Sequence, residues 1–261
     1  MTATLGEPTA PDGYADVPCE VVRLKARRRA IARSMEVAGR IPCLTADMQI
    51  DLGALLEART AYHDAASTGG RLSVMAFLAR AAVDTLAEFP DFNASYTERA
   101  LVRWTPVNLS VAVDSAGGLV VPVVRQADRL DVVELGARIA VLAQRARDGD
   151  LSLDDLAGGT FTLSNPGAVG PVLRAEALLN PPQVALLGLP AMKKIPVVVA
   201  DADGNDRVEI RTVVCPSLTF DHRVLDGAEA VRFLDALRRR VEGWSLADYL
   251  TPADSDARGD A

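Results

Sequence analysis

Few side chains in this sequence can act as a general base near neutral pH. The 261 residues include two histidines, His63 and His222, and the lysines are Lys25, Lys193 and Lys194. Imidazole titrates close to neutral pH and can take a proton from a thiol or a hydroxyl. His222 follows a predicted strand and precedes a predicted helix, a junction that can present a side chain at the end of a sheet. From spacing alone, a structural role for His222 stays open.

Two further polar positions allow more than one interpretation. Asp226 precedes a predicted helix and has Glu229 three residues later, which is the pattern of a capping box. Ser164 ends a predicted strand, where its hydroxyl can donate to an oxyanion, but Asn165 and the Pro-Gly after it also favour a turn. No Gly-x-Ser-x-Gly motif occurs, which argues against a serine hydrolase of the α/β kind.

Composition excludes several classes of partner. The formal net charge is −7, so we do not expect binding to nucleic acid, which depends on neutralising phosphates. Cys19, Cys43 and Cys215 lie far apart and form no Cys-x-x-Cys pair, which favours reduced thiols and a cytoplasmic protein. No apolar run is long enough to span a bilayer, and the N-terminus does not have the order of a secretory signal. The acidic run from Asp201 to Asp206 lacks the final bidentate ligand of a calcium loop, so no metal site is predicted.

The patterning of the chain predicts one α/β domain over residues 21–250, between a flexible arm (1–20) and a disordered tail (251–261). A mixed sheet with helices packed on it accommodates the order of elements. Helices are expected over 27–37, 52–65, 72–89, 132–146 and 227–241. Strands are expected over 107–113, 119–124, 160–164, 184–189, 197–199, 208–214 and 217–221.

Five motifs, in order along 21–241, carry a resemblance to a known family. They are Phe-Pro-Asp-Phe-Asn-Ala (89–94), Gly-Leu-Val-Val-Pro-Val (118–123), Gly-Gly-Thr-Phe-Thr-Leu-Ser-Asn (158–165), Asn-Pro-Pro-Gln with Leu-Leu-Gly (180–188), and Asp-His-Arg-Val-Leu-Asp-Gly (221–227). Together they resemble the acyltransferase (E2) catalytic domains of 2-oxoacid dehydrogenase complexes and the related chloramphenicol acetyltransferases. The resemblance implies a mixed-sheet sandwich that forms homotrimers, with acyl-CoA and a small-molecule acceptor entering a channel between two subunits.

The resemblance also implies a role for each candidate residue. His222 would remove the acceptor's proton, and Ser164 of the neighbouring subunit would hydrogen-bond the oxyanion. Asp226 would act structurally by pairing with an arginine near the first helix, for which Arg28 is the candidate. Asn165 and Gly227 would support the site. Residues that bind the co-substrate, acetyl-CoA, are not identified, and neither a metal nor a lipoyl group on this chain is expected.

Departures from the family pattern bear on the acceptor. The lysines lie in the wrong contexts to carry a lipoyl group, Pro166 replaces an apolar residue, and residues 170–177 differ from the family's version. These features favour a free-standing enzyme, similar to the O-acetyltransferases of tetronate pathways, that acetylates a hydroxyl. A dihydrolipoyllysine acyltransferase core and a non-catalytic scaffold on the same fold remain as alternatives.

Overall fold

The computed structural model describes Pro11 and residues 17–65, 72–115, 117–174, 176–201 and 203–244. The helices are α1 (Ala26–Ala38), α2 (Gly53–Ala65), α3 (Val74–Glu88), α4 (Val132–Asp148) and α5 (Gly227–Glu242). The strands are β1 (Cys43–Asp47), β2 (Ile50–Asp51), β3 (Ala94–Thr97), β4 (Ala100–Arg103), β5 (Leu109–Val111), β6 (Val123–Val124), β7 (Phe161–Ser164), β8 (Ala185–Gly188), β9 (Lys193–Ala200), β10 (Asp206–Val214) and β11 (Ser217–Asp221). Short 3-10 helices include η3 (Asp154–Leu156) and η4 (Pro166–Ala168).

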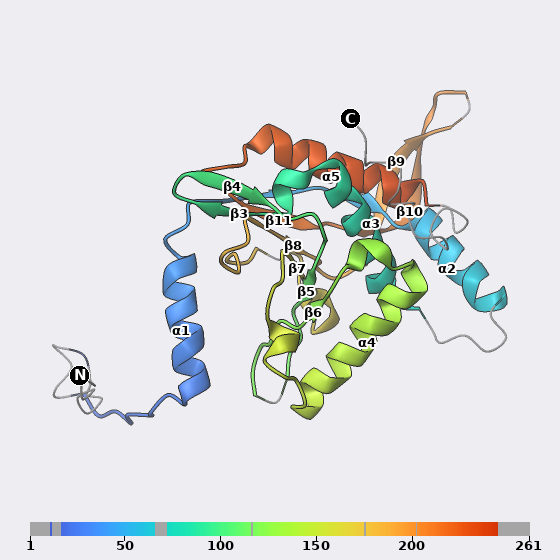
Figure 1. The fold of residues 1–261 in the computed structure, drawn as a ribbon. Coiled ribbons are helices and arrows are strands. Elements are labelled where there is room, and N and C mark those ends of the chain that lie inside the picture. The colour runs from blue at the N-terminus through green and yellow to red at the C-terminus, as the bar shows by residue number, and fades with distance from the viewer. Residues whose placement is uncertain are drawn as a thin grey trace.

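A six-stranded mixed sheet forms the centre of the molecule, in the order β1-β11-β8-β7-β5-β6 (Figure 1). Strand β7 runs parallel to both β5 and β8, whereas β11 is antiparallel to β8 and to β1. A three-stranded sheet, β2-β10-β9, and the β3-β4 hairpin complete the strands of the described residues. The α/β fold with a mixed sheet, expected from the order of patterns, is confirmed.

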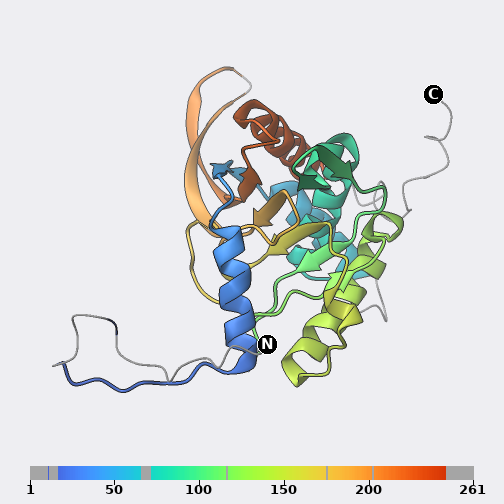
Figure 2. The same ribbon diagram turned by 60° about the vertical axis from the view of Figure 1, so that its left-hand side comes forward.

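Helices α3, α4 and α5 cover one face of the central sheet, and the apolar core lies between the two layers (Figure 2). Phe233 of α5 meets Phe161 of β7 and Phe92, with ring centroids 6.3 Å and 4.7 Å apart. The sequence sets the start of α4 and α5, since Asp131 and Asp226 form the capping boxes that begin these two helices. The predicted capping box at Asp226 is therefore confirmed.

The opposite face of the sheet is polar, although much of it is buried. Because side chains alternate along a strand, Thr162 and Ser164 point away from the face on which Phe161 and Leu163 meet the helices. Their neighbours on this polar face include Ser110 on β5 and, further across the sheet, Thr219, whose hydroxyl lies 2.9 Å from that of Thr45. Every buried hydroxyl here needs a hydrogen-bond partner, which makes the polar face dependent on correct strand register.

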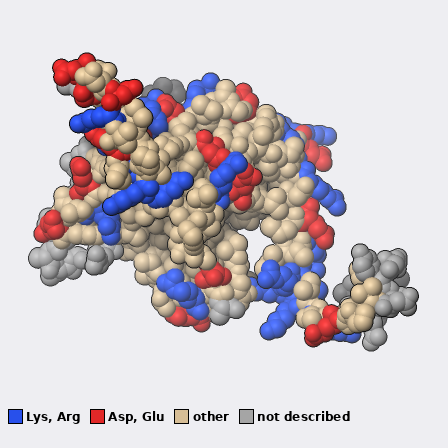
Figure 3. Space-filling model, turned by 180° about the vertical axis from the view of Figure 1, so that it is seen from behind, with Lys and Arg blue, Asp and Glu red and all other residues tan. Residues whose placement is uncertain are grey.

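Two elements project from this body. Helix α1 stands off the sheet, and the β9-β10 hairpin extends past the edge of the molecule (Figures 1 and 2). In Figure 3 the Lys and Arg side chains of the α1 region gather on the projecting part. Arg27 ties α1 to the chain beyond β5, because its Nη2 donates to the carbonyl oxygens of Gly118 at 3.1 Å and Leu119 at 3.3 Å. On the hairpin, Val198, Val208 and Ile210 are 65%, 70% and 75% exposed.

The five expected helices and most expected strands occur, with ends shifted by a few residues. Strands β1 to β4 were not predicted, because their short segments show neither a clean alternation nor a strong turn signal. The predicted tail (251–261) and most of the predicted arm (1–20) lie outside the described residues. The single domain over 21–250 stays a prediction for the same reason at its C-terminal end.

Candidate active site

His222 lies just after β11, at the end of this strand in the central sheet. Its backbone N–H donates to the carbonyl oxygen of Pro42 at 2.9 Å, which ties the residue to the segment entering β1. The imidazole is exposed and lies beside the ring of Phe220, with 5.7 Å between centroids. An exposed imidazole anchored through its backbone can meet a substrate proton without unfolding the surrounding chain.

An ion pair between buried Asp221 and partly exposed Arg223 brackets His222. Asp221 is 1% exposed, and its carboxylate accepts Nε of Arg223 at 2.9 Å, Nη2 at 2.6 Å and the Arg223 backbone N–H at 3.0 Å. The hydrogen bonds from Arg223 to Asp221 raise the pKa of the guanidinium, which therefore stays charged. The guanidinium also lies 4.3 Å from the ring centroid of Tyr96. A buried strand ending in aspartate, with arginine two residues later, is the signal that was available.

The neighbouring thiol of Cys43 responds to the same carboxylate. Cys43 pairs with Asp221 across β1 and β11. Burial raises the pKa of this thiol, and the negative charge of Asp221 raises it further. Cys43 is therefore held as a thiol near neutral pH and is a poor nucleophile.

Ser164 is the last residue of β7, and its neighbours on the adjacent strands are small. Gly188 of β8 is its cross-strand partner, and on the other side Ala112 donates its N–H to Leu163. Among the described residues no partner is recorded for the Ser164 hydroxyl, and the residue is half-buried. The hydroxyl is thus placed to donate to a group that approaches the polar face of the sheet.

The segment after Ser164 folds over the same end of the sheet. Pro166–Ala168 forms η4, and a Cβ on Gly167 would lie 2.4 Å from the backbone of Pro190. Further along, Arg174 pairs with the carboxylate of Asp47 at 2.6 Å, and this carboxylate also accepts the hydroxyl of Ser217. The segment therefore reaches from β7 across to β1 and covers the row of residues that contains Ser164.

Ser164 and His222 lie at opposite ends of the sheet within one chain. Ser164 is level with Gly188, and Gly188 is level with Ser217 at the start of β11. His222 is five positions further along, about 17 Å at roughly 3.4 Å per residue, and two strand spacings add about 10 Å sideways. The resulting separation, about 20 Å, is too large for the two side chains of one chain to act on the same carbonyl.

The other predicted site residues divide in the structure. Asp226 caps α5 by accepting the N–H of Glu229 at 2.9 Å, and no ion pair with Arg28 is recorded among the described residues. The Arg28 guanidinium lies beside Gly118 instead. Asn165 precedes η4, next to Ser164, and Gly227 begins α5 in open space, with no atom within 4 Å of an added Cβ. Their roles in the site stay predictions.

His63, the second histidine, serves the fold. Its Nε2 accepts the backbone N–H of Leu72 at 3.1 Å. Since the sequence contains no third histidine, His222 is the one imidazole left for chemistry.

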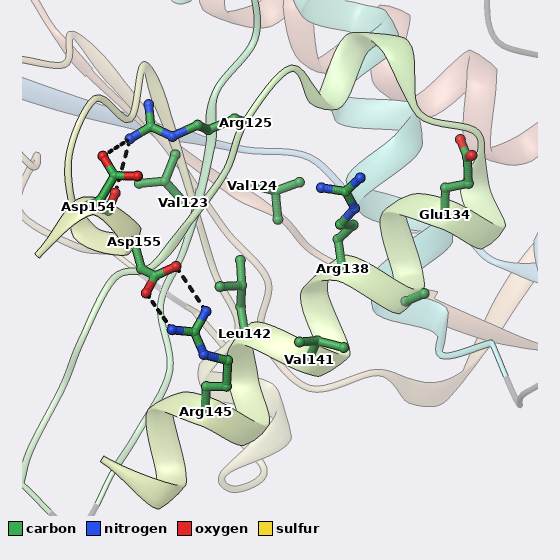
Figure 4. Close-up of a pocket in the computed structure, with 11 residues that line it drawn as sticks. Val123, Val124, Arg125, Glu134, Arg138, Val141, Leu142, Arg145, Asp154 and Asp155 are labelled. Atoms are coloured by element: carbon green, nitrogen blue, oxygen red, sulfur yellow. Dashed lines mark hydrogen bonds and ion pairs between the residues drawn. The ribbon is translucent and has the colours of Figure 1, made fainter. Parts of the chain in front are cut away.

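A surface groove of about 620 Å³ lies elsewhere, between α4 and the β6-η3 region (Figure 4). Val124 and Leu142 are among its apolar lining residues, and two ion pairs, Arg125–Asp154 and Arg145–Asp155, stand along one side. Neither Ser164 nor His222 lines it. Within the described part of the chain no group of three or more His, Cys, Asp or Glu could hold a metal ion, and no helix is long and apolar enough to cross a membrane.

Comparison with known proteins identifies the family. Residues 17–247 match the model of the 2-oxoacid dehydrogenases acyltransferase catalytic domain. The chain belongs to this acyltransferase family. It is 40% identical over 203 residues to the dihydrolipoyllysine-residue acetyltransferase component of the Mycobacterium tuberculosis pyruvate dehydrogenase complex, covering 76% of this chain and 36% of that protein. It is 35% identical to the mitochondrial succinyltransferase component of the 2-oxoglutarate dehydrogenase complex of Saccharomyces cerevisiae, covering 90% of this chain and 50% of that protein.

Solved acyltransferase structures show the same fold. Dihydrolipoamide acetyltransferase of Azotobacter vinelandii superposes with a TM-score of 0.81 at 32% identity, covering 90% of this chain and 96% of that chain. A probable dihydrolipoamide acetyltransferase from Listeria monocytogenes gives 0.80 at 31% identity, covering 87% and 96%. The expected relationship to E2 acyltransferases is thereby shown. The chain spans about a third to a half of the two curated relatives described above.

The comparisons change the assignment of the acceptor. The curated relatives described above are named for dihydrolipoyllysine residues, and no finding supports a tetronate hydroxyl or a natural-product pathway. The departures at Pro166 and residues 170–177 remain, but the described part of this segment, through Arg174, covers one end of the sheet. Of the alternatives raised by the sequence, an E2 catalytic core is therefore better supported than a free-standing O-acetyltransferase.

Proposed function

We propose that this chain is the catalytic core of a dihydrolipoyllysine acyltransferase, which moves an acyl group between the thiol of CoA and a thiol of dihydrolipoamide. The observation that carries the proposal is the presence of both an exposed His222 and an open Ser164 hydroxyl on a domain of the acyltransferase family. A thioester and a thiol are exchanged for a thioester and a thiol, so the reaction needs no metal or redox partner.

Each step follows from ordinary thiol chemistry. A free thiol has a pKa of about 8.5 and imidazole about 6.5, so His222 can take the attacking thiol's proton as the sulfur bonds to the thioester carbonyl. The carbonyl oxygen then carries negative charge, which the Ser164 hydroxyl stabilises by donating a hydrogen bond. When the intermediate collapses, the carbon–sulfur bond of the leaving thiolate breaks, and His222 returns the proton to it.

The separation of the two groups implies that two chains build each site. Because about 20 Å lies between Ser164 and His222 within one chain, the base of one copy works with the hydroxyl of another. Exposed apolar side chains on α1 and on the β9-β10 hairpin, such as Met35 and Ile210, supply surface for such contacts. A homotrimer built in this way has three equivalent sites, one at each contact between neighbouring copies.

A related protein supports the residue assignment. The Azotobacter vinelandii acetyltransferase structure concerns a serine, a histidine and an asparagine in that enzyme's catalytic mechanism, and the histidine and asparagine stand four positions apart. His222 and Asp226 have the same spacing. We therefore assign Asp226 a structural role beside the base, through the capping of α5, with Asn165, Gly227 and Arg28 as supporting residues.

The test measures acyl transfer from acetyl-CoA and succinyl-CoA to dihydrolipoamide, with a hydroxylated small molecule as a competing acceptor. His222→Ala should lose turnover while retaining the wild-type assembly in sedimentation, and Ser164→Ala should be slower by a factor of about 10²–10³. His63→Gln, which alters the other histidine, is the matched control and should transfer at a normal rate. Near-normal transfer by His222→Ala would overturn the mechanism, and transfer only to the hydroxyl would overturn the acceptor.

A further inference from the structure

A chain of three buried side chains crosses the polar face of the sheet next to Ser164. The amide of Gln183 joins two strands, since its Oε1 accepts the hydroxyl of Thr162 on β7 at 2.5 Å. Its Nε2 donates to the hydroxyl of Ser110 on β5 at 3.2 Å. Gln183 is 3% exposed, Thr162 2% and Ser110 1%, so solvent cannot replace either bond.

Gln183 is itself held from two sides. Its backbone N–H donates to the carbonyl oxygen of Asn180 at 3.1 Å, and its main chain forms a β-bridge with Ser95 of β3. The residue precedes β8, which is the strand on the other side of β7. The amide thus links the two neighbours of β7 to β7 itself.

A glycine makes room for this amide. A Cβ on Gly159, just before β7, would lie 1.9 Å from the Ser110 hydroxyl and 3.0 Å from Nε2 of Gln183. The space that a larger residue would fill is occupied by the hydroxyl and the amide. The Gly-Gly pair that begins the 158–165 motif is therefore part of the same hydrogen-bonded arrangement of Ser110, Thr162 and Gln183.

The network fixes which face of β7 carries the catalytic hydroxyl. Thr162 and Ser164 are two residues apart and share a face, so any register in which Thr162 reaches Gln183 also turns Ser164 to the polar face. A slip of one residue would exchange Ser164 with Leu163 and leave three buried polar groups without partners. The neighbours of Ser164 on the adjacent strands, Gly188 and Ala112, are too small to hold its side chain. The position of the Ser164 hydroxyl therefore depends on the position of β7.

We infer that Gln183 is a positioning residue, which holds β7 through Thr162 and Ser110 and so keeps the Ser164 hydroxyl aimed at the oxyanion. This inference rests on the proposed acyl transfer and goes beyond it, because Gln183 does not itself contact the reacting atoms. An oxyanion donor acts in the transition state and not on bound substrate, so misplacing it lowers kcat and leaves KM unchanged.

The experiment compares Gln183→Met and Thr162→Val with the wild type in acetyl-CoA:dihydrolipoamide transfer. Each variant should lower kcat about tenfold with KM for acetyl-CoA within about twofold, and Thr162→Ser, which retains the hydroxyl, should recover most of the loss. Thr45→Val removes a half-buried, hydrogen-bonded hydroxyl on β1, away from β7, and controls for general loss of stability. If Gln183→Met does not fold, the pair of Thr162 variants carries the test.

A double-mutant cycle separates positioning from a merely structural role. In a Ser164→Ala background, Gln183→Met should cost less than about a further twofold, since the hydroxyl that it positions is gone. An equal loss in both backgrounds, or no loss in either, would overturn the inference while leaving the acyl transfer itself intact.

Amide hydrogen exchange provides a readout that needs no activity. Exchange in the β7 peptide should be faster in Gln183→Met than in the wild type and unchanged in Thr45→Val. Unchanged β7 exchange in Gln183→Met would also reject the inference. Absence of transfer by the wild-type protein, by contrast, would count against the proposed function.

Discussion

Removing Arg223 tests the ion pair that brackets His222, the proposed catalytic base. In Arg223→Ala the carboxylate of Asp221 loses the Nε and Nη2 donors at 2.9 Å and 2.6 Å and retains the backbone N–H of residue 223 at 3.0 Å. The Asp221 side chain is 2% exposed, so the charge is left largely buried with one donor in place of several.

The expected cost lies between two limits. Breaking a fully buried ion pair costs about 3–5 kcal/mol, whereas an exposed pair contributes about 0–1 kcal/mol. The Arg223 side chain is 40% exposed, so water can enter the space that it vacates and solvate the carboxylate in part. We therefore expect a loss of about 2 kcal/mol in the free energy of unfolding, or roughly 4–8 °C in Tm for a domain of this size.

Thermal unfolding by circular dichroism measures this loss, and acyl transfer measures its effect on His222. Asp221→Asn in the Arg223→Ala background should recover about 1 kcal/mol, because the double variant no longer buries an unpaired charge. Turnover should fall in Arg223→Ala, since Asp221 and Arg223 are the two residues on either side of the base. A Tm within 1 °C of the wild type, or a double variant less stable than the single one, would refute the reasoning.

Two further predictions follow from the loop contacts. Hydrogen bonds from the Ser152 hydroxyl, the larger effect, and from Arg145 lower the pKa of Asp155 from 3.8 to about 2. The ionised Asp155 carboxylate therefore stabilises the fold above about pH 4, and this stabilisation is lost as the pH falls through 2. The Tm difference between the wild type and Asp155→Asn should therefore be constant from pH 7 to 5 and close towards pH 2; a difference that grows in acid would contradict this sign. Gly167→Ala should unfold at a lower temperature because its Cβ would meet the backbone at 2.4 Å, whereas Gly170→Ala, with open space around it, should match the wild type. Equal melting temperatures for these two variants would show that the loop packs differently.

Much of the architecture followed from local patterns in the sequence. The helical periodicity of residues 74–88 and 132–148, and the alternation around Phe161 and Leu163, marked the faces that the core buries. The capping box at Asp226 was legible because its hydrogen bonds join residues three positions apart. Strand β1 was missed because its partner, β11, lies far along the chain.

The candidate catalytic residues and the family could be predicted from the sequence, because residue types and their spacing are read directly along the chain. The sequence supplied two histidines, a serine at a strand end and the ordered motifs of an acyltransferase. Only the tertiary structure decided how these residues relate, because strand direction and register depend on contacts between distant segments. The antiparallel run of β11 against β8 sends His222 to the end of the sheet opposite Ser164, and the proposal that a second copy of the chain completes the site rests on this geometry.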